Sequence, residues 1–125
     1  MNETCLILGD SIAVGLASVI KGCVVVAKVG MSSTWIMANA PTMQADRVYI
    51  SSGSNDPDNP ALSANLEHTR AKIGGVITWI EPVNARAASV VAAVAAKHGD
   101  RVVSFTPGRD NVHPKSYEAL GRAVQ

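Results

Sequence analysis

Short apolar runs recur along the chain and are separated by longer stretches of mixed polarity. The runs occupy residues 5–8, 23–29, 47–51, 76–80 and 101–105. Several of them are almost continuous in valine and isoleucine rather than alternating with polar residues. Such runs are typical of strands that are buried on both faces of a sheet, so we predict five strands of this kind.

The stretches between the runs carry signals for helices. The predicted helices cover residues 12–20, 33–40, 59–73, 85–98 and 115–124. Asn59 and Pro60 form a good start for the third helix, as N-cap and first-turn residue. Gly74 and Gly75 are predicted to end the third helix, and Gly99 the fourth.

Strands and helices therefore alternate, an order that predicts an α/β fold with a parallel sheet between two layers of helices. The 125 residues fit one domain covering residues 1–125, with no internal repeat or linker. In open sheets of this kind, ligands bind beyond the carboxyl ends of the strands. Residues that directly follow the predicted strands are thus the first candidates for a functional site.

Composition and charge narrow the function classes. Apolar residues make up 47% of the chain and charged residues 17%, which favours a globular protein over a disordered one. The net charge of +1 and the lack of a basic, aromatic-rich run give no indication of nucleic-acid binding. Residues 1–4 lack a basic flank, and the apolar run behind them ends at Asp10. We therefore expect neither a signal peptide nor a membrane-inserted segment, and a protein that is cytoplasmic at synthesis.

The cysteines and histidines do not indicate a metal site. Cys5 and Cys23 fall on the first two predicted strands, and no Cys/His cluster has the spacing of metal ligands. Without an export signal, we expect the two thiols to be reduced and to lie in the core. The sequence predicts no metal and no cofactor.

Two positions far apart in the sequence suggest a nucleophile and its base. Ser11 follows the first strand and opens a helix, while Asp110 and His113 lie in a turn before the last helix. A serine hydroxyl needs a base to take its proton, usually a histidine that a carboxylate orients. If the segment turns, Asp110 can reach Nδ1 of His113, which leaves Nε2 free to face Ser11.

Acyl transfer also needs donors aimed at the developing oxyanion. Three candidates follow the first three strands: the backbone N–H groups of Ser11 and Gly30, and the side-chain amide of Asn55. Taken singly, these positions have ordinary interpretations as a helix cap, a left-handed glycine and a turn. Because all of them follow strands in the right order, the combination favours an enzyme.

Four short blocks of the chain resemble the SGNH hydrolase family, also called GDSL esterases and lipases. The blocks are Gly9-Asp10-Ser11-Ile12, Gly30, Gly53-Ser54-Asn55-Asp56 and Asp110-Asn111-Val112-His113. The resemblance spans residues 6–114. The Gly-x-Ser-x-Gly elbow of the α/β-hydrolases is absent, because residue 13 is alanine.

The resemblance implies a flavodoxin-like, three-layer α/β/α sandwich with five parallel strands in the order 2-1-3-4-5. It also implies a serine esterase that works through an acyl-enzyme. The implied roles are nucleophile for Ser11, the other triad members for Asp110 and His113, oxyanion donors for Ser11, Gly30 and Asn55, and supporting positions for Asp10, Gly53 and Asp56.

Loop length bears on the substrate. SGNH hydrolases are commonly longer, and here residues 51–59 and 106–113 are almost all there is to build a rim. A short rim favours a shallow site and a small acyl group, such as acetyl, on a carbohydrate or a cell-wall polysaccharide. Two alternatives stay open: an idle SGNH-fold module for glycan binding or assembly, and a phage-type hydrolase that degrades cell walls. The oligomeric state is not indicated.

Four further residues have open interpretations. Trp35 follows the Gly30 loop and either lines the site or packs in the core. Glu81 and Pro82 end the fourth strand and are expected to border the substrate. Arg109 either contacts an anionic substrate or is a solvated loop residue.

Overall fold

The computed structural model describes residues 4–125, and its strands and helices alternate as predicted. The strands are β1 (Cys5–Gly9), β2 (Val24–Ala27), β3 (Met43–Ser51), β4 (Ile73–Ile80) and β5 (Arg101–Val103). The helices are α1 (Ser11–Val19), α2 (Ser33–Asn39), α3 (Leu62–Ala71), α4 (Ala85–His98) and α5 (Tyr117–Val124). Residues 1–3, on which the expectation about an export signal partly rests, lie outside the described part of the chain.

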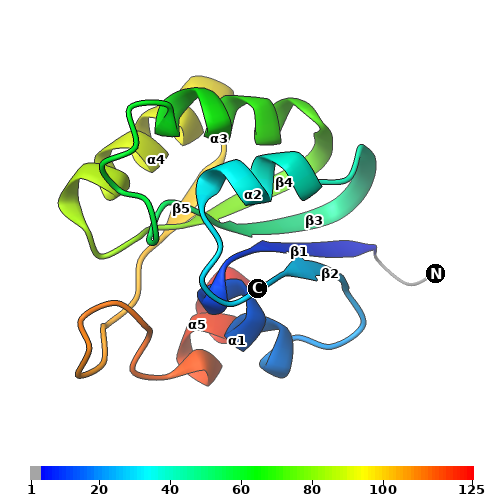
Figure 1. Cartoon of the computed structure of the whole chain (residues 1–125). Helices are drawn as coiled ribbons and strands as arrows, with labels where there is room; N and C mark the ends of the chain where they lie inside the picture. Colours follow the sequence, from blue (N-terminus) through cyan, green and yellow to red (C-terminus); the bar gives the residue numbers. More distant parts are fainter. Residues whose placement is uncertain (1–3) are drawn as a thin grey trace.

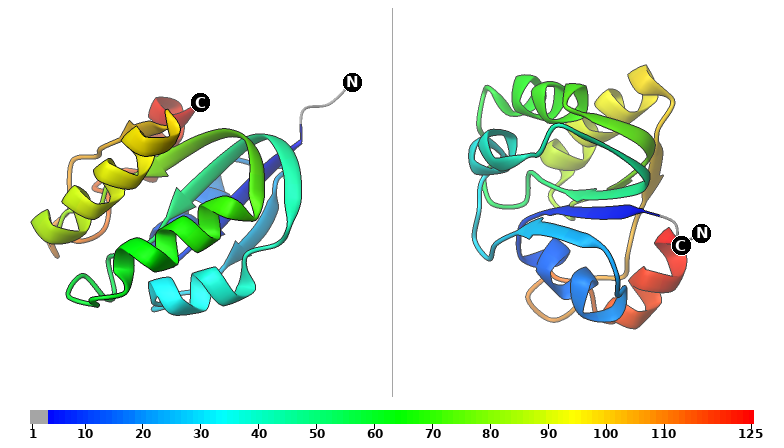
Figure 2. Two further views of the ribbon diagram at one scale, coloured as in Figure 1. Left: turned by 90° about the horizontal axis from the view of Figure 1, so that it is seen from above. Right: turned by 90° about the vertical axis from the view of Figure 1, so that its right-hand side faces the viewer.

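The five strands form one parallel sheet in the order β2-β1-β3-β4-β5, which confirms the predicted architecture. Helices α2, α3 and α4 cover one face, and α1 and α5 cover the other (Figures 1 and 2). β1 serves both layers: Leu6 and Leu8 pack beneath α2–α4, while Ile7 packs against α1 and α5. Within residues 4–125, no helix combines the length and the apolar character needed to cross a bilayer.

The prediction for the third helix was wrong at both ends. α3 begins after Asn59, whose Oδ1 instead accepts a hydrogen bond from the backbone N–H of Ala61 at 2.9 Å and so closes the preceding turn. Gly74 and Gly75 lie inside β4. Gly75 has φ +130°, and a Cβ there would lie 1.8 Å from the carbonyl oxygen of Ala45 on β3. These glycines therefore permit a close approach of two strands rather than ending a helix.

The prediction of reduced core thiols was also wrong, because Cys5 and Cys23 form a disulfide with their Cα atoms 4.7 Å apart. The sheet register explains the pairing. Leu6 on β1 faces Val24 on β2. Cys5 directly precedes Leu6, and Cys23 directly precedes Val24, so the two cysteines also face each other. Neighbouring strands lie about 4.8 Å apart, a separation at which two cysteines can be bridged.

Removing this cross-link should destabilise the fold. We expect the double variant Cys5→Ala/Cys23→Ala to lose about 3 kcal/mol of unfolding free energy, because the bridge closes a loop of 18 residues in the unfolded chain. Urea denaturation with and without a reductant measures the effect. Reductant should bring the wild type down to the level of the variant and leave the variant unchanged. A variant as stable as the oxidised wild type would contradict the prediction.

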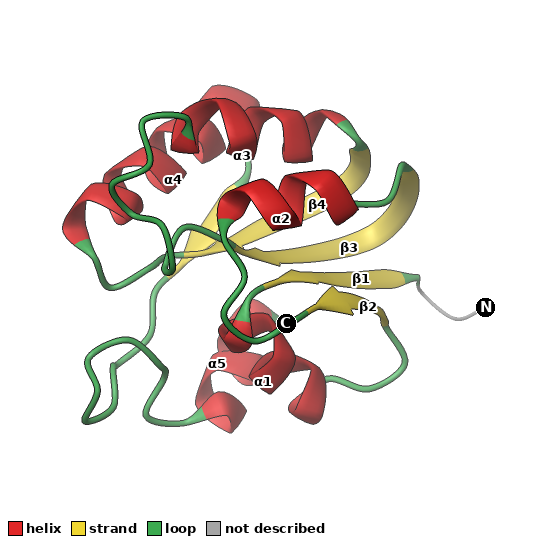
Figure 3. Ribbon diagram, viewed as in Figure 1, coloured by secondary structure: helices red, strands yellow, loops and turns green. Residues whose placement is uncertain are grey.

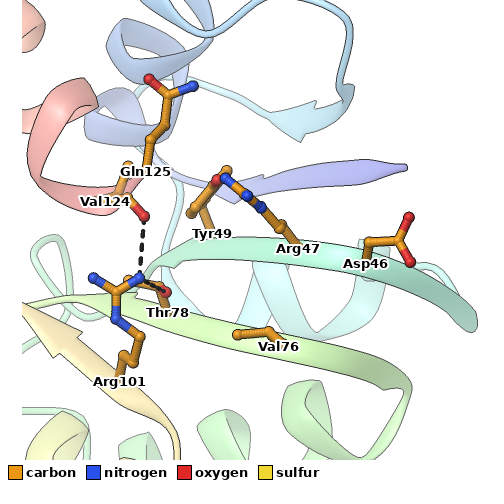
Figure 4. A pocket seen from close by; sticks show the side chains of 8 residues that line it. All are labelled: Asp46, Arg47, Tyr49, Val76, Thr78, Arg101, Val124 and Gln125. Carbon is orange, nitrogen blue, oxygen red and sulfur yellow. Dashed lines mark hydrogen bonds between the residues drawn. The ribbon is translucent and has the colours of Figure 1, made fainter. Parts of the chain in front are cut away.

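Arg101 ties the last helix to the sheet at the amino ends of the strands (Figure 4). Its Nη1 donates hydrogen bonds to the carbonyl oxygen of Val124 at 3.2 Å and to Oγ1 of Thr78 at 3.5 Å. Both partners line a pocket of about 350 Å³ between β3, β4, β5 and the end of α5. Arg101 thus holds the end of α5 against the sheet. The pocket lies away from the strand ends at which the predicted site residues gather.

Candidate active site

The loops that follow the carboxyl ends of the strands gather at one edge of the sheet (Figure 3). Because all five strands are parallel, each turn from a strand into a helix lies at this edge. The four sequence blocks that were singled out each contribute to one of these turns. Residues far apart in the sequence therefore meet here.

The structure brings Ser11, His113 and Asp110 into one chain of hydrogen bonds. Oγ of Ser11 lies 2.7 Å from Nε2 of His113, although 102 residues separate them in the sequence. Nδ1 of the same imidazole lies 2.5 Å from Oδ2 of Asp110. With Nδ1 bonded to a carboxylate, the proton sits on Nδ1 and Nε2 is left to accept from the serine hydroxyl.

The side chain of Asp110 stabilises the turn in which it lies. Oδ1 of Asp110 accepts hydrogen bonds from the backbone N–H groups of Val112 at 3.0 Å and His113 at 2.9 Å. Asn111 adopts φ +58°, a conformation that asparagine tolerates better than most residues. The hydrogen bonds from His113 and from the backbone lower the pKa of Asp110 to about 2. Its carboxylate is therefore ionised at all ordinary pH values.

The side chains of His113 and Asp110 are accessible to solvent. The His113 side chain is 41% exposed and that of Asp110 is 54% exposed. A short antiparallel bridge closes the loop around them: the backbone N–H of Gly108 donates to the carbonyl of His113, and that of Lys115 to the carbonyl of Thr106, each at 2.8 Å. The backbone of the loop is thus hydrogen-bonded across its base, while the two side chains stay open to solvent.

The candidate oxyanion donors also meet at this edge. Ser11 is the first residue of α1, where backbone N–H groups have no partner within the helix. Gly30 has φ +80°, which favours glycine. Nδ2 of Asn55 donates to the carbonyl oxygen of Met31 at 2.9 Å and so binds the loop after β3 to the loop after β2. The amide nitrogen carries a second N–H beyond the one used in this bond.

Asp10 braces the start of α1, the helix that begins with Ser11. It is fully buried, and its Oδ1 accepts from the backbone N–H of Ile12 at 3.1 Å and from Oγ of Ser51 at 2.8 Å. One carboxylate oxygen therefore caps α1 and joins it to the end of β3. Within residues 4–125, Oδ2 has no hydrogen-bond partner. Burial is the main reason that the pKa of Asp10 is raised to about 6.

The raised pKa of Asp10 makes stability depend on pH. Because folding raises this pKa from 3.8, the resulting stabilisation is full below about pH 3.8 and is lost as the pH rises through about 6. Asp10→Asn keeps an Oδ1 acceptor but cannot ionise. We expect the variant to lack the loss of unfolding free energy, about 1–3 kcal/mol, that the wild type shows as the pH rises from 4 to 8.

Urea denaturation at pH 4 and pH 8 tests this expectation. The wild type should have a lower unfolding free energy at pH 8 than at pH 4, and this drop should be smaller in Asp10→Asn. Asp58→Asn, which alters an exposed carboxylate on the loop after β3, should keep the wild-type difference. An identical pH dependence in Asp10→Asn and the wild type would show that Asp10 does not titrate as described.

Asp56 and Gly53 shape the loop that follows β3. Asp56 Oδ1 accepts from the backbone N–H of Ser33 at 2.9 Å, and Oδ2 accepts from Oγ of Ser33 at 2.5 Å and from Nδ2 of Asn59 at 3.0 Å. This carboxylate ties the loop after β3 to the start of α2. Gly53 has φ +107° and allows β3 to turn into that loop. Both residues therefore shape the loop that carries Asn55.

The residues with open interpretations lie mostly outside the site. Trp35 is partly buried and packs against the core beneath α2–α4, and Pro82 is buried. The backbone N–H of Glu81 donates to the carbonyl of Val103 at 2.9 Å and so extends the pairing of β4 with β5. Arg109 lines the same hollow as His113.

Sequence reasoning missed Tyr117, the first residue of α5. Its ring packs so closely on α1 that a Cβ at Gly15 would lie 2.2 Å from it. Burial raises the pKa of the Tyr117 hydroxyl, and the charges of Asp10 and Asp110 raise it further. The ring therefore joins α5 to α1. A tyrosine in an amphipathic helix gives no sign of this position in the sequence.

In the part of the chain that the structure describes, residues 4–125, no group of three or more His, Cys, Asp or Glu side chains could hold a metal ion.

Comparison with known proteins gives a likeness in structure alone. No family model matches the chain, and no match is found among the curated proteins. The chain is similar to the solved C-terminal catalytic domain of Streptococcus pneumoniae peptidoglycan O-acetyltransferase A with a methylsulfonyl adduct. The TM-score is 0.59 and the identity 19%, over 98% of this chain and 88% of that one. This likeness shows that the chain has an SGNH-like fold, the fold that its sequence blocks led us to expect.

Proposed function

We propose that the protein is a serine esterase that hydrolyses a carboxylic ester through an acyl-enzyme. The observation that carries the proposal is the continuous hydrogen-bond chain from Ser11 Oγ through His113 to Asp110, with distances of 2.7 Å and 2.5 Å. A nucleophile, a base and an orienting carboxylate in this order are the parts that acyl transfer to serine requires.

In the proposed reaction, Oγ of Ser11 attacks the ester carbonyl carbon while Nε2 of His113 takes the hydroxyl proton. The tetrahedral intermediate collapses, the ester C–O bond breaks, and the alkoxide leaves with the proton from His113. Water then attacks the acyl-enzyme with the same base and releases the acid. Asp110, ionised because its pKa is about 2, stabilises the imidazolium in both steps.

The negative charge that develops on the carbonyl oxygen needs donors. In the proposed site these are the N–H groups of Ser11 and Gly30 and the second N–H of the Asn55 amide. The bond from Asn55 to the carbonyl of Met31 supports this role, because it fixes the amide beside the Gly30 turn before substrate binds. A donor that is already oriented costs no reorganisation during the reaction.

Loss of the Asn55 amide should slow catalysis without preventing it. We expect Asn55→Ala to lower kcat by about two to three orders of magnitude, the usual effect of removing one oxyanion donor. Initial rates with p-nitrophenyl acetate measure the change, and Asn39→Ala, an exposed asparagine at the end of α2, is the control. A wild-type kcat in Asn55→Ala would exclude the amide from the oxyanion site.

The proposed substrate is a short acyl group, such as acetyl, on a carbohydrate or cell-wall polysaccharide. The exposure of His113 and Asp110 supports a large alcohol component, because it leaves room above the base. The likeness to a peptidoglycan O-acetyltransferase domain favours the same substrate class and adds a second candidate, in which a carbohydrate hydroxyl replaces water as the acceptor.

A substrate panel tests the proposal. Acetate release from peptidoglycan, xylan and capsule is compared with hydrolysis of p-nitrophenyl esters of increasing chain length, and we expect acetyl esters to be preferred. Acetyl transfer to added oligosaccharides separates the acyltransferase from the esterase. A fluorophosphonate probe should label Ser11. An unlabelled protein that releases no acetate would instead be a binding module.

A further inference from the structure

We propose that the site selects esters whose alcohol component carries an anionic group, bound by Arg109 and Lys115. The inference rests on the proposed function and names the substrate class of that same site. Both cations line one hollow of about 830 Å³ together with His113. An open space beside the His113 imidazole is thus bordered by two positive charges.

The charges of this hollow do not cancel. Of the charged groups that line it, Asp110 alone is acidic, and its carboxylate is bonded to the imidazole and to two backbone N–H groups. Among residues 4–125, neither Arg109 nor Lys115 forms an ion pair with a carboxylate. Two exposed cations thus lie beside a single carboxylate, so the charged groups that line the hollow leave it with a net positive charge.

The geometry assigns the anion to the alcohol component of the ester. The base that takes the serine proton returns it to the leaving alkoxide, so that oxygen must lie at Nε2 of His113. The hollow includes His113, whereas the candidate oxyanion donors lie on other loops. Ser11 is not among the residues that line the hollow, so in the proposed complex a group attached to the leaving oxygen passes the imidazole to reach Arg109 and Lys115.

The loop that carries the two cations is held in a defined shape. Pro107 and Pro114 form an antiparallel bridge across its base, and the backbone of Lys115 is bonded to Thr106 at 2.8 Å. Arg109 directly precedes the orienting Asp110. The backbone positions that carry the two charges are thus set relative to His113, and both side chains can reach an anion of suitable length. A neighbouring cavity of about 250 Å³ lined by Ser54, Asn84 and Asn111 has no charged lining residue, which restricts the preference to the His113 side.

Two aryl acetates of similar shape isolate the effect of charge. The first is 4-acetoxybenzoate, which is anionic, and the second is 4-acetoxybenzamide, which is neutral. Each kcat/KM is divided by the rate of hydroxide-catalysed hydrolysis, to remove the difference in intrinsic reactivity. The wild type should prefer the anionic ester by about three- to tenfold at low salt, since each exposed ion pair contributes little. The preference should shrink at high ionic strength.

The double variant Arg109→Gln/Lys115→Gln should bring the ratio of the two substrates close to one. Lys21→Gln/Arg122→Gln removes the same net charge from exposed positions outside the hollow and should keep the wild-type ratio. 4-Acetoxybenzenesulfonate and 4-acetoxyphenyl phosphate, used in parallel, distinguish a carboxylate site from one for sulfate- or phosphate-bearing glycans.

The possible failures are distinguishable. Equal normalised rates for the anionic and neutral esters in the wild type would overturn the inference and leave the esterase intact. A preference that also disappears in Lys21→Gln/Arg122→Gln would assign it to overall charge and overturn the inference as well. Rates no higher than those of Ser11→Ala with every substrate would refute the proposed function itself.

Discussion

Ser11→Ala should lower kcat for p-nitrophenyl acetate by about three to six orders of magnitude. The substitution removes the hydroxyl that lies 2.7 Å from Nε2 of His113 and leaves the rest of the site in place. The backbone N–H of residue 11 remains, and the cap of α1 is provided by Asp10 rather than by the serine. The loss therefore reports the nucleophile and not a disturbed helix.

The control for this variant is Ser89→Ala, an exposed serine on α4. It should keep wild-type kcat and wild-type labelling by a fluorophosphonate probe, while Ser11→Ala loses both. Activity of Ser11→Ala within tenfold of the wild type would disprove the acyl-enzyme mechanism. Unfolding curves recorded for both variants separate a loss of chemistry from a loss of folded protein.

Asp110→Asn should be nearly as damaging, with kcat lowered by about three to four orders of magnitude. The asparagine keeps an oxygen for the backbone N–H groups of Val112 and His113, so the turn is preserved. It presents an N–H to Nδ1 of His113, where the carboxylate accepts a hydrogen bond. The imidazole then carries its proton on Nε2 and cannot accept one from Ser11.

Two measurements check the interpretation of this variant. Asp58→Asn, an exposed aspartate on another loop at the same edge of the sheet, should leave kcat unchanged. Since the pKa of Asp110 is about 2, wild-type activity should show no loss from protonation of this carboxylate above about pH 4. Loss of kcat to the same extent in Asp58→Asn, or full activity in Asp110→Asn, would remove Asp110 from the mechanism.

Much of the fold could be predicted because buried parallel strands leave a direct trace in the sequence. Nearly continuous apolar runs marked the strands, and their alternation with helices indicated a parallel sheet. The glycine pair 74–75 misled the prediction, because glycine permits both a helix end and a close approach of strands. Only the position of Ala45 on β3, which the sequence does not reveal, decides between these uses.

The meeting of the candidate site residues could be predicted from the order of the strands. Ser11, Asn55 and His113 were identified because each follows a strand, and parallel strands bring such residues together. The disulfide was not predicted, since it depends on the register of β1 with β2 rather than on spacing along the chain. Tyr117 was missed for a related reason: its contact with α1 is set by how α5 packs, not by its own helix.

The residues of the candidate site are held in place by two separate parts of the structure, and the disulfide belongs to only one of them. Gly30 follows β2, a four-residue edge strand that pairs with β1 alone and is clamped to it by Cys5–Cys23 at its far end. Ser11 and His113 are held instead by a helix and by a self-bonded loop. A thiol reductant and acid should therefore act on different parts of the candidate site. We expect reducing agents to loosen the support of Gly30, the proposed oxyanion donor, and strong acid to protonate Asp110, the proposed partner of His113.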